Sequence, residues 1–423
     1  MRILWFTNTP CKAIHVLTGQ SVTSGGWLYS LSEYVSKIPG VELHIAFYWG
    51  KALEPFIYES VFYHPILRKG DGNKVGRLIN RFRMAYFREG ESLVVQKLQQ
   101  VVNEINPDLI HIHGSEDNFG LIASNKQNCP VVLSIQGILS VLYDFLFRGY
   151  SKKEIAQNEG LKAKVIMNGV TVQEHSLRKK MEREKRIFSY IDHIIGRTFW
   201  DRNVSLAFNP YRHYYEVGEI LRPAFFKAHW NKKKFSSPLT IISTTSAGYY
   251  KGFESILRTA QVLKSIGFSF QWNVIGLSYD DNIVHLAERV VGININSLNI
   301  GLLGRKDAVD LAHFMEESDI FAQVSHMENS SNSLCEAMLL GMPIIATFAG
   351  GTASILVNNQ EGILVQDGDP YVLAGAIVEM ANNTDIAIKM GENAAKKAAT
   401  RHAPETVCSQ LMNVYTLILQ NHV

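Results

Sequence analysis

Short runs rich in β-branched and aromatic residues alternate with helix-length segments along this chain of 423 residues, and the series occurs twice. A strand followed by a helix-length crossover is the repeating unit of a parallel sheet. The runs of the first series are RILWF, ELHIAFY, LIHIH, VVLSIQ and HIIGRT, and those of the second are LTIISTTS, QWNVIG, DIFAQVS, PIIATF and GILVQ. This alternation predicts two successive open α/β domains, whose ligands bind at the carboxyl ends of the strands.

A polar segment, KKKFSSP at 232–238, separates the two series and is interpreted as a hinge. We expect an N-terminal domain over residues 1–230 and a C-terminal domain over residues 236–404. The last segment has apolar residues at helical spacing, which are Val407, Leu411, Val414, Tyr415 and Ile418. Residues 405–423 are therefore expected to form a helix that packs back on the N-terminal domain.

The composition is that of an ordinary globular protein, with 46% apolar and 10% aromatic residues and a mean hydropathy near zero. No apolar run reaches the roughly 20 residues of a spanning helix, and MRILWFTNTP has too short an apolar run for a secretory signal. The cysteines lack the spacing of a zinc site or a disulfide framework; they are Cys11, Cys129, Cys335 and Cys408. We therefore expect a cytoplasmic protein.

A net charge of +3 is too small to indicate nucleic-acid binding. One stretch, however, is strongly basic and has apolar residues between its cations. These cations are Arg68, Lys69, Lys74, Arg77, Arg81, Arg83 and Arg88. The pattern is typical either of an amphipathic surface for anionic lipid or lipid diphosphate, or of a solvated helix face. The first interpretation predicts peripheral contact with the inner face of a membrane.

Two glutamates, Glu328 and Glu336, stand eight positions apart in SHMENSSNSLCEAMLLGMP. In one continuous helix their Cα atoms would lie about 12 Å apart, which is too far for one small shared site. The Ser and Asn residues between them favour a helix start near Ser331 or Asn332, and Gly341 favours its end. Glu328 is then expected on a loop after the strand DIFAQVS.

A helix N-terminus presents unpaired N–H groups and the positive end of the helix dipole, which suits a phosphate. The small side chains of residues 330–333 would let a phosphate approach, while the two carboxylates accept hydrogen bonds from flanking hydroxyl groups. This combination indicates a nucleotide sugar. A hydrolase pair fits less well, because its carboxyl groups lie about 5 to 9.5 Å apart across one bond. Two surface glutamates beside a capped helix remain an alternative.

The pattern resembles the retaining glycosyltransferases of family 4, within glycosyl transferases group 1, which have the GT-B fold. That fold consists of two Rossmann-like, open parallel-sheet domains that face a cleft. The resemblance rests on the two glutamates and on YKG, ESDIFAQVS, AMLLGMPIIAT, GG, EGILV and DGDP. It is specific over residues 241–381 and looser in the N-terminal half, where SGG at 24–26 and HIHG at 111–114 look like acceptor-side features.

The resemblance implies roles for individual residues. Glu336 resembles the glutamate that holds the ribose hydroxyls, and Glu328 resembles the one near the donor sugar. Lys251 matches a lysine that neutralises the diphosphate leaving group, and His113 matches a histidine beside the donor sugar. The other donor-binding positions implied are the amides of Asn332, Ser333 and Leu334 and the loop glycines Gly25 and Gly26.

The chain departs from the family near the lysine. The family often has an arginine five or six residues before it, where this chain has Thr245 or Ser246. Either these hydroxyls suffice for the diphosphate, or a second cation comes from Arg197 or Arg305, which both follow strand-like runs. His113 also has a plainer interpretation, as a packed strand histidine.

The resemblance implies transfer of a hexose, with retention, from a UDP-sugar or GDP-sugar to a saccharide or lipid-linked saccharide in cell-surface polysaccharide biosynthesis. The sequence has no His, Cys, Asp or Glu cluster with metal-ligand spacing, so we expect catalysis without a metal and without a cofactor besides the donor. Two alternatives remain, a nucleotide-sugar-binding protein without transferase activity and a GT-B-like sugar epimerase.

Overall fold

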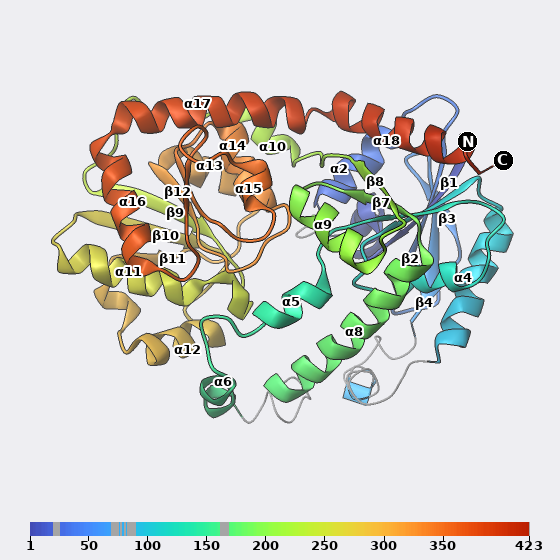
Figure 1. The fold of residues 1–423 in the computed structure, drawn as a ribbon, viewed down its shortest axis with the longest axis horizontal. Coiled ribbons are helices and arrows are strands. Elements are labelled where there is room, and N and C mark those ends of the chain that lie inside the picture. The colour runs from blue at the N-terminus through green and yellow to red at the C-terminus, as the bar shows by residue number, and fades with distance from the viewer. Residues whose placement is uncertain are drawn as a thin grey trace. The chain divides into compact units, whose positions relative to one another are not determined.

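The chain forms two compact units, each built around a sheet (Figure 1). A computed structural model describes residues 1–19, 26–68, 76, 78, 79, 82, 90–160 and 169–422. Unit 1 comprises Met1–Tyr143, Glu159–Ile220 and Ala403–Val423, and unit 2 comprises Asp144–Asn158 and Leu221–His402.

The sheet of unit 1 has eight strands among the described residues, in the order β3-β4-β2-β1-β5-β6-β7-β8. These strands are β1 (Arg2–Thr7), β2 (Glu42–Trp49), β3 (Phe56–Tyr58), β4 (Val61–Leu67), β5 (Leu109–His113), β6 (Val131–Ser134), β7 (His193–Gly196) and β8 (His213–Glu216). All neighbouring strands pair in parallel except β3 and β4. The carboxyl ends of the central strands β1, β5, β6 and β7 therefore lie along one edge.

Helices cover both faces of this sheet. On one face α2 (Gly26–Val35) and α18 (Pro404–Gln420) pack on alternate strand residues such as Ile3 and Trp5. On the other face α4 (Glu91–Ile105) and α8 (Val170–Tyr190) pack on Leu4 and Phe6. The shorter helices assigned to this unit, in whole or in part, are η1 (Cys11–Ala13), α1 (Ile14–Thr18), η2 (Phe119–Ser124), α5 (Leu139–Phe145) and α9 (Phe199–Phe208).

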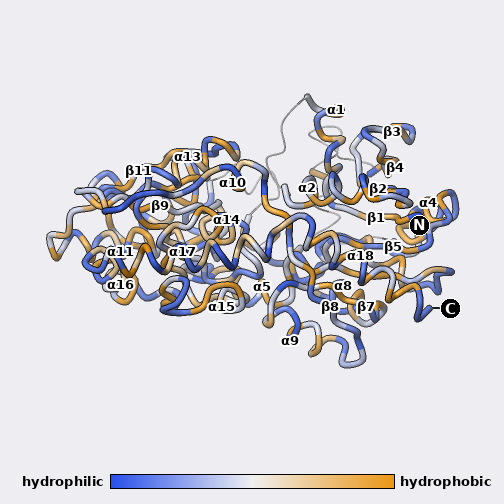
Figure 2. Tube along the Cα trace, turned by 90° about the horizontal axis from the view of Figure 1, so that it is seen from above, coloured by the Kyte–Doolittle hydropathy of each residue, from blue (hydrophilic) through white to orange (hydrophobic). Residues whose placement is uncertain are grey.

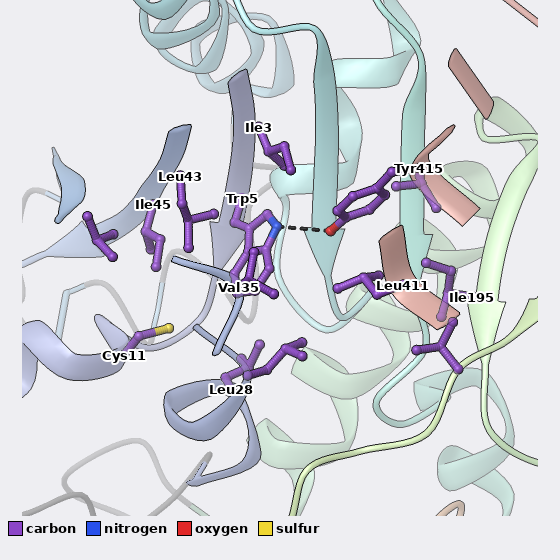
Figure 3. Packing of buried hydrophobic residues seen from close by; sticks show 14 of the residues in the cluster. Ile3, Trp5, Cys11, Leu28, Val35, Leu43, Ile45, Ile195, Leu411 and Tyr415 are labelled. Carbon is purple, nitrogen blue, oxygen red and sulfur yellow. Dashed lines mark hydrogen bonds between the residues drawn. The ribbon is translucent and has the colours of Figure 1, made fainter. Parts of the chain in front are cut away.

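The C-terminal helix α18 packs on unit 1, as expected from its apolar spacing (Figure 1). All five residues of its predicted apolar face are buried. The hydroxyl of Tyr415 accepts a hydrogen bond from Trp5 Nε1 at 3.0 Å, inside the apolar cluster around Trp5 (Figure 3). The same hydroxyl lies 2.5 Å from His111 Nδ1. A polar contact in the core thus fixes the helix to β1 and β5.

The sheet of unit 2 is parallel throughout and has the order β11-β10-β9-β12-β13-β14. Its strands are β9 (Leu239–Thr244), β10 (Phe270–Ile275), β11 (Ile300–Leu302), β12 (Ile320–Gln323), β13 (Ile344–Thr347) and β14 (Ile363–Val365). The strand order reverses direction at β9, so β9 and β12 are the neighbours whose carboxyl ends form the switch point where such sheets bind ligands.

The helices of unit 2 follow the same two-layer plan. One layer packs on residues such as Ile242 and Phe321 and contains α10 (Pro223–Lys227), α13 (Ala308–Glu317), α14 (Asn332–Leu340) and α17 (Thr384–Arg401). The remaining helices are α6 (Lys152–Asn158), η3 (Tyr249–Lys251), α11 (Phe253–Ser265), α12 (Asn282–Val291), η4 (Ile295–Ser297), α15 (Thr352–Ile355) and α16 (Pro370–Asn382). Along labelled helices such as α11 and α17, hydrophobic and hydrophilic residues alternate, as helices covering a sheet require (Figure 2).

The ten runs predicted as strands all contain strands, and the predicted pair of open parallel α/β folds is confirmed. Helix α14 begins at Asn332 and is followed by Gly341 in the left-handed region at φ 82°, as predicted. Asp369 caps α16 through hydrogen bonds from the Tyr371 and Val372 amides. Among the helices that the structure describes, none combines the length and apolar character needed to cross a membrane.

The segment interpreted as a hinge at 232–238 is anchored within unit 2. Lys232 Nζ lies 2.6 Å from the buried carboxylate of Asp319, which also accepts the Ser236 amide. Upstream, Phe225 and Trp230 are buried in the core of unit 2. The boundary between the two units on this part of the chain therefore lies between Ile220 and Leu221, before the expected domain end at residue 230.

Of the basic stretch from Arg68 to Arg88, only Arg68 among the cations lies in the described residues, where it pairs with Asp117.

Candidate active site

Lys251 and Glu328 form an ion pair in unit 2, with Nζ and Oε1 2.7 Å apart. Lys251 ends the short helix η3, and Glu328 lies on the loop between β12 and α14, as the sequence predicted for a position after DIFAQVS. Although burial lowers the pKa of the Lys251 ammonium, the charge of Glu328 raises it above its ordinary value. Lys251 is therefore a fixed cation at the carboxyl end of β9, paired with the carboxylate predicted to face the donor sugar.

Gly252 allows the loop to place Lys251 beside the neighbouring strand. Its φ of 73° lies in the left-handed region, and a Cβ at this position would collide with the carbonyl oxygen of Val324. Only glycine adopts this conformation at such a close approach without strain. The YKG sequence thus has a structural role, which is to bring Lys251 against the chain that follows β12.

Glu336 is buried on α14 and is held by Arg222. Its Oε1 and Oε2 accept hydrogen bonds from Arg222 Nε and Nη2, each at 2.7 Å. Burial raises the pKa of Glu336 above its ordinary value, and the charge of Arg222 opposes that rise. The bidentate geometry orients the carboxylate and leaves it lone pairs for further donors.

The first turn of α14 carries the three predicted amides, those of Asn332, Ser333 and Leu334. Ser331 occupies the N-cap position, but within the described residues its side chain makes no capping hydrogen bond, contrary to the predicted capping role. The first intrahelical bond from this turn is donated by Cys335 to the Ser331 carbonyl. Amides of the first turn have no intrahelical acceptor, so they can bind an anionic group.

The other residues predicted to bind the donor diphosphate in this unit differ in burial. Thr245 is half-buried and Ser246 is exposed on the loop that leads from β9 to Lys251. Arg305 is exposed on the loop after β11. All three therefore follow carboxyl ends of strands in the same sheet, but no contact joins them to Lys251 or Glu336 among the described residues.

His113 ends β5 in unit 1 and is buried against aromatic rings. Its ring centroid lies 4.5 Å from that of Trp5 and 5.8 Å from that of Trp27. Neither ring nitrogen has a hydrogen-bond partner among the described residues. Burial, and then the neighbouring His111 and Arg197, hold the pKa of His113 well below its ordinary value, so the imidazole is neutral. A buried neutral imidazole without partners can bind a hydroxyl group.

Arg197 lies near His113 in the same unit, just beyond the end of β7. Its guanidinium stacks 4.1 Å from the ring centroid of Trp27, and its Nε lies 3.5 Å from the buried carboxylate of Glu219. Gly26 begins α2, directly before Trp27, whereas Gly25 lies outside the described residues. The predicted residues His113, Arg197 and Gly26 therefore gather around one indole ring.

Arg222 is the main site residue that the sequence patterns did not indicate. It lies 114 positions from Glu336, directly before Pro223 at the start of α10, in a segment expected to close the N-terminal domain. The sequence offered one weak signal for this residue, which is an arginine directly before a proline that can start a helix. That pattern does not indicate a carboxylate partner.

A family model described as "Glycosyl transferases group 1" matches residues 225–397. Among curated relatives, an uncharacterized glycosyltransferase of Methanocaldococcus jannaschii is 24% identical over 87% of this chain and 88% of its own length. A capsular polysaccharide biosynthesis glycosyltransferase, CapM, of Staphylococcus aureus is 23% identical over 40% of this chain and 44% of its own length.

Solved structures resemble the fold over nearly the whole chain. A sucrose-phosphate synthase of Thermosynechococcus elongatus has a TM-score of 0.71 at 14% identity, with 99% of each chain covered. Anabaena HepE, solved in complex with UDP and glucose, has a TM-score of 0.62 at 15% identity, with 98% and 99% covered. The fold is GT-B, and residues 225–397 of it match the group 1 glycosyltransferase model.

Proposed function

We propose that this chain transfers a hexose from a nucleotide diphosphate sugar to a hydroxyl acceptor and retains the configuration at the anomeric carbon. The observation that carries the proposal is the Lys251–Glu328 ion pair, whose carboxylate lies on the loop that leads into the uncapped first turn of α14. The cation and the free amides suit a diphosphate leaving group, and the carboxylate suits a sugar hydroxyl. A preorganised cation is most effective where negative charge develops in the transition state.

In the proposed reaction, the bond between the anomeric carbon and the β-phosphate oxygen breaks while the acceptor oxygen attacks from the same face. The acceptor proton passes to an oxygen of the departing diphosphate, so a nucleoside diphosphate and the glycoside are the products. Lys251 and the amides of Asn332 and Ser333 stabilise the charge on the diphosphate. This route needs no nucleophilic side chain.

Glu336 is proposed to accept hydrogen bonds from the ribose hydroxyls, with Arg222 orienting its carboxylate through two hydrogen bonds. His113 is proposed to bind a hydroxyl of the donor sugar through its unpartnered ring nitrogens. Thr245, Ser246 and Arg305 are the candidates for further diphosphate contacts. Arg197 is the weaker candidate, because Glu219 and Trp27 already hold its guanidinium.

UDP is the first nucleotide to test, because the related fold of HepE was solved with UDP and with UDP-glucose. GDP-sugars remain the alternative donors. The acceptor is proposed to be a saccharide or a lipid-linked saccharide, since relatives are named for capsular polysaccharide and amylovoran biosynthesis. The proposed reaction needs no metal, and its place is the cytoplasm or the inner face of the membrane.

The experiment is acceptor-dependent nucleotide release from UDP-glucose, UDP-N-acetylglucosamine and GDP-mannose, each measured with and without a chelator. Lys251→Met should lower kcat/KM by roughly a hundredfold or more, because it removes the cation that stabilises the charge on the leaving group. Glu336→Gln should also lower kcat/KM, because it weakens the hydrogen bonds to the ribose hydroxyls. Proton NMR of the product reports the anomeric configuration. An inverted product would refute retention, and loss of transfer with the chelator would refute metal independence.

The same assay separates the alternatives. A binding protein without activity would bind nucleotide and release none, and an epimerase would convert the sugar without an acceptor. Lys251 is held as a cation by Glu328, which supports its proposed role at the leaving group. The binding protein would use the same cation, so nucleotide release decides between the two.

A further inference from the structure

His326 lies between two carboxylates inside unit 2. Its Nε2 is 2.8 Å from Oε1 of Glu254, and its Nδ1 is 3.1 Å from Oδ2 of Asp367. The histidine is 3% exposed, and Glu254 is buried beside it. Both ring nitrogens therefore have an acidic partner in a site that excludes most water.

The two contacts determine the charge of the ring. An ionised carboxylate only accepts hydrogen bonds, whereas a neutral imidazole has a single N–H to donate. Both contacts are hydrogen bonds only when the ring is an imidazolium with two N–H groups. Although burial lowers the pKa of His326, its hydrogen bonds to Glu254 and Asp367 raise it above the ordinary value.

His326 lies on the loop that carries Glu328, whereas Asp367 lies in the turn between β14 and α16. Glu254 stands three positions after Lys251, at the second residue of α11. His326 stands two positions before Glu328, and its backbone N–H donates to the Tyr250 carbonyl at 2.8 Å. The imidazolium thus connects the start of α11, just after Lys251, to the loop that carries Glu328.

The segment 144–158 of the same unit brings further charged and titratable groups to this cluster. Arg148 Nε lies 3.6 Å from Oδ2 of Asp367, so one carboxylate is shared between two cations. Burial and the charge of Glu254 hold the pKa of Tyr150 well above its ordinary value, so this phenol stays neutral. Gly149 packs directly against Glu254, where a Cβ would collide with its carboxylate.

We propose that His326 is a positioning residue, whose imidazolium form holds Lys251 and Glu328 in the arrangement that binds the donor diphosphate. Its role in transfer rests on the function proposed above, whereas its role in holding the two loops does not. Deprotonation would leave one carboxylate facing a lone pair, and the connection between the loops would weaken. The consequence is a chain whose donor binding declines on the alkaline side.

The sign of this pH dependence follows from linkage. A histidine whose pKa is higher in the folded than in the unfolded state contributes stability that is fully present below the unfolded pKa of about 6.5. That contribution is lost as the pH rises through the folded pKa. The Lys251–Glu328 loops are therefore expected to be most ordered below about pH 6.5 and to lose order as the pH rises through the folded pKa of His326.

The first test is NMR of the full chain labelled with ¹⁵N in its histidines, with His326→Gln used for assignment. His326 should show two protonated ring nitrogens at pH 7, and Glu254→Gln and Asp367→Asn should each lower its pKa. A neutral ring at pH 7 in the wild-type chain would overturn the proposal. This measurement needs no ligand, and Glu254→Gln and Asp367→Asn identify the His326 signal independently by the shift in its pKa.

The second test is amide hydrogen exchange at pH 7 for peptides that cover residues 249–254 and 324–331. His326→Gln should speed exchange in both peptides by about tenfold or more, because both lose one shared anchor. His313→Gln is the matched control. His313 is exposed, and its Nε2 lies 3.9 Å from Glu317 of the same helix, so the substitution removes no contact between the two loops. Unchanged exchange in either peptide of His326→Gln would refute the connection.

The third test uses UDP as the probe. The Kd of wild-type chain for UDP should rise at least about tenfold as the pH passes the His326 pKa measured by NMR, and His326→Gln should bind weakly at every pH. A Kd with the same pH dependence in both chains would overturn the positioning role. Failure of UDP to bind at any pH would instead contradict the proposed UDP donor, and the first two tests would still decide whether His326 holds the loops.

Discussion

At the scale of single residues, the candidate active site consists of pairs whose members are far apart in the sequence. Lys251 and Glu328 are 77 positions apart, and Arg222 and Glu336 are 114 apart. Each glutamate was predicted as a site residue from its local pattern. The contact of Glu328 with Lys251 and that of Glu336 with Arg222 were not predicted. A spacing rule reports which residues share one loop or helix turn, and it contains no information on which cation the fold brings to a carboxylate.

Gln323 offers a test of a buried polar group. It ends β12 at 5% exposure, and both its side-chain oxygen and nitrogen lack hydrogen-bond partners among the described residues. Gln323→Leu keeps a similar volume and removes two unsatisfied groups, so it should raise the free energy of unfolding by about 1 to 3 kcal/mol. Urea denaturation measures the change. Gln271→Leu on β10 is the control, because its Nε2 has a partner in Asn273, and a destabilised Gln323→Leu would contradict the prediction.

Glu116 gives a prediction on pH. Burial raises the pKa of this carboxyl to about 7, against hydrogen bonds that include one from the Gly137 amide. Because the folded pKa exceeds the unfolded one, the group contributes stability that is present below about pH 4.5 and lost as the pH rises through 7. Glu116→Gln, which cannot ionise, should therefore raise Tm relative to wild type at pH 8 and change it little at pH 5. A variant with the same Tm difference at both values would show that ionisation of Glu116 is not the cause.

At the scale of elements, apolar periodicity and capping residues predicted the helices and strands whose formation depends on the local sequence. Strands such as β1 and β5 were predicted because their β-branched and aromatic runs are long enough to be distinctive. Four of the described strands were missed for identifiable reasons. β4 is interrupted by Pro65, and β8 has four residues without an aliphatic side chain. β3 and β11 have only three residues each, which is too short for a distinctive pattern. Their pairing depends on the neighbouring strands, which a local pattern cannot report.

Gly252 shows how one turn connects strand, helix and site. Gly252→Ala should lower the free energy of unfolding by more than Gly267→Ala does, although both glycines have φ near 70°. The left-handed backbone costs a β-carbon of the order of 1 kcal/mol at either position. Only at Gly252 does the added atom also collide with the Val324 carbonyl.

Thermal and urea unfolding of the two glycine variants measure this difference. UDP binding provides a second readout, because displacement of the turn moves Lys251 away from Glu328. Equal destabilisation in both variants would mean that the turn relaxes without cost and that the close approach to Val324 is unimportant.

At the scale of the whole molecule, the chain passes between its two units several times, yet each unit has its own sheet and core. Unit 1 is completed by α18, the last helix of the chain, which buries Tyr415 against Trp5 and His111. The Lys251, Glu328 and Glu336 contacts lie entirely within unit 2. A change in the core of unit 1 should therefore loosen that unit without altering the contacts in the other.

Tyr415→Phe tests this independence. It removes one hydroxyl and leaves Trp5 Nε1 and His111 Nδ1 buried without that partner, which should cost about 1 to 3 kcal/mol. Amide exchange should increase in peptides of β1, β5 and α18 and stay unchanged in those of β9 and β12. Thr416→Ala is the control, because Thr416 is the exposed neighbour of Tyr415 on the same helix. Faster exchange in β9 or β12 would show that the two units unfold as one, and the donor site would then depend on the core of the other unit.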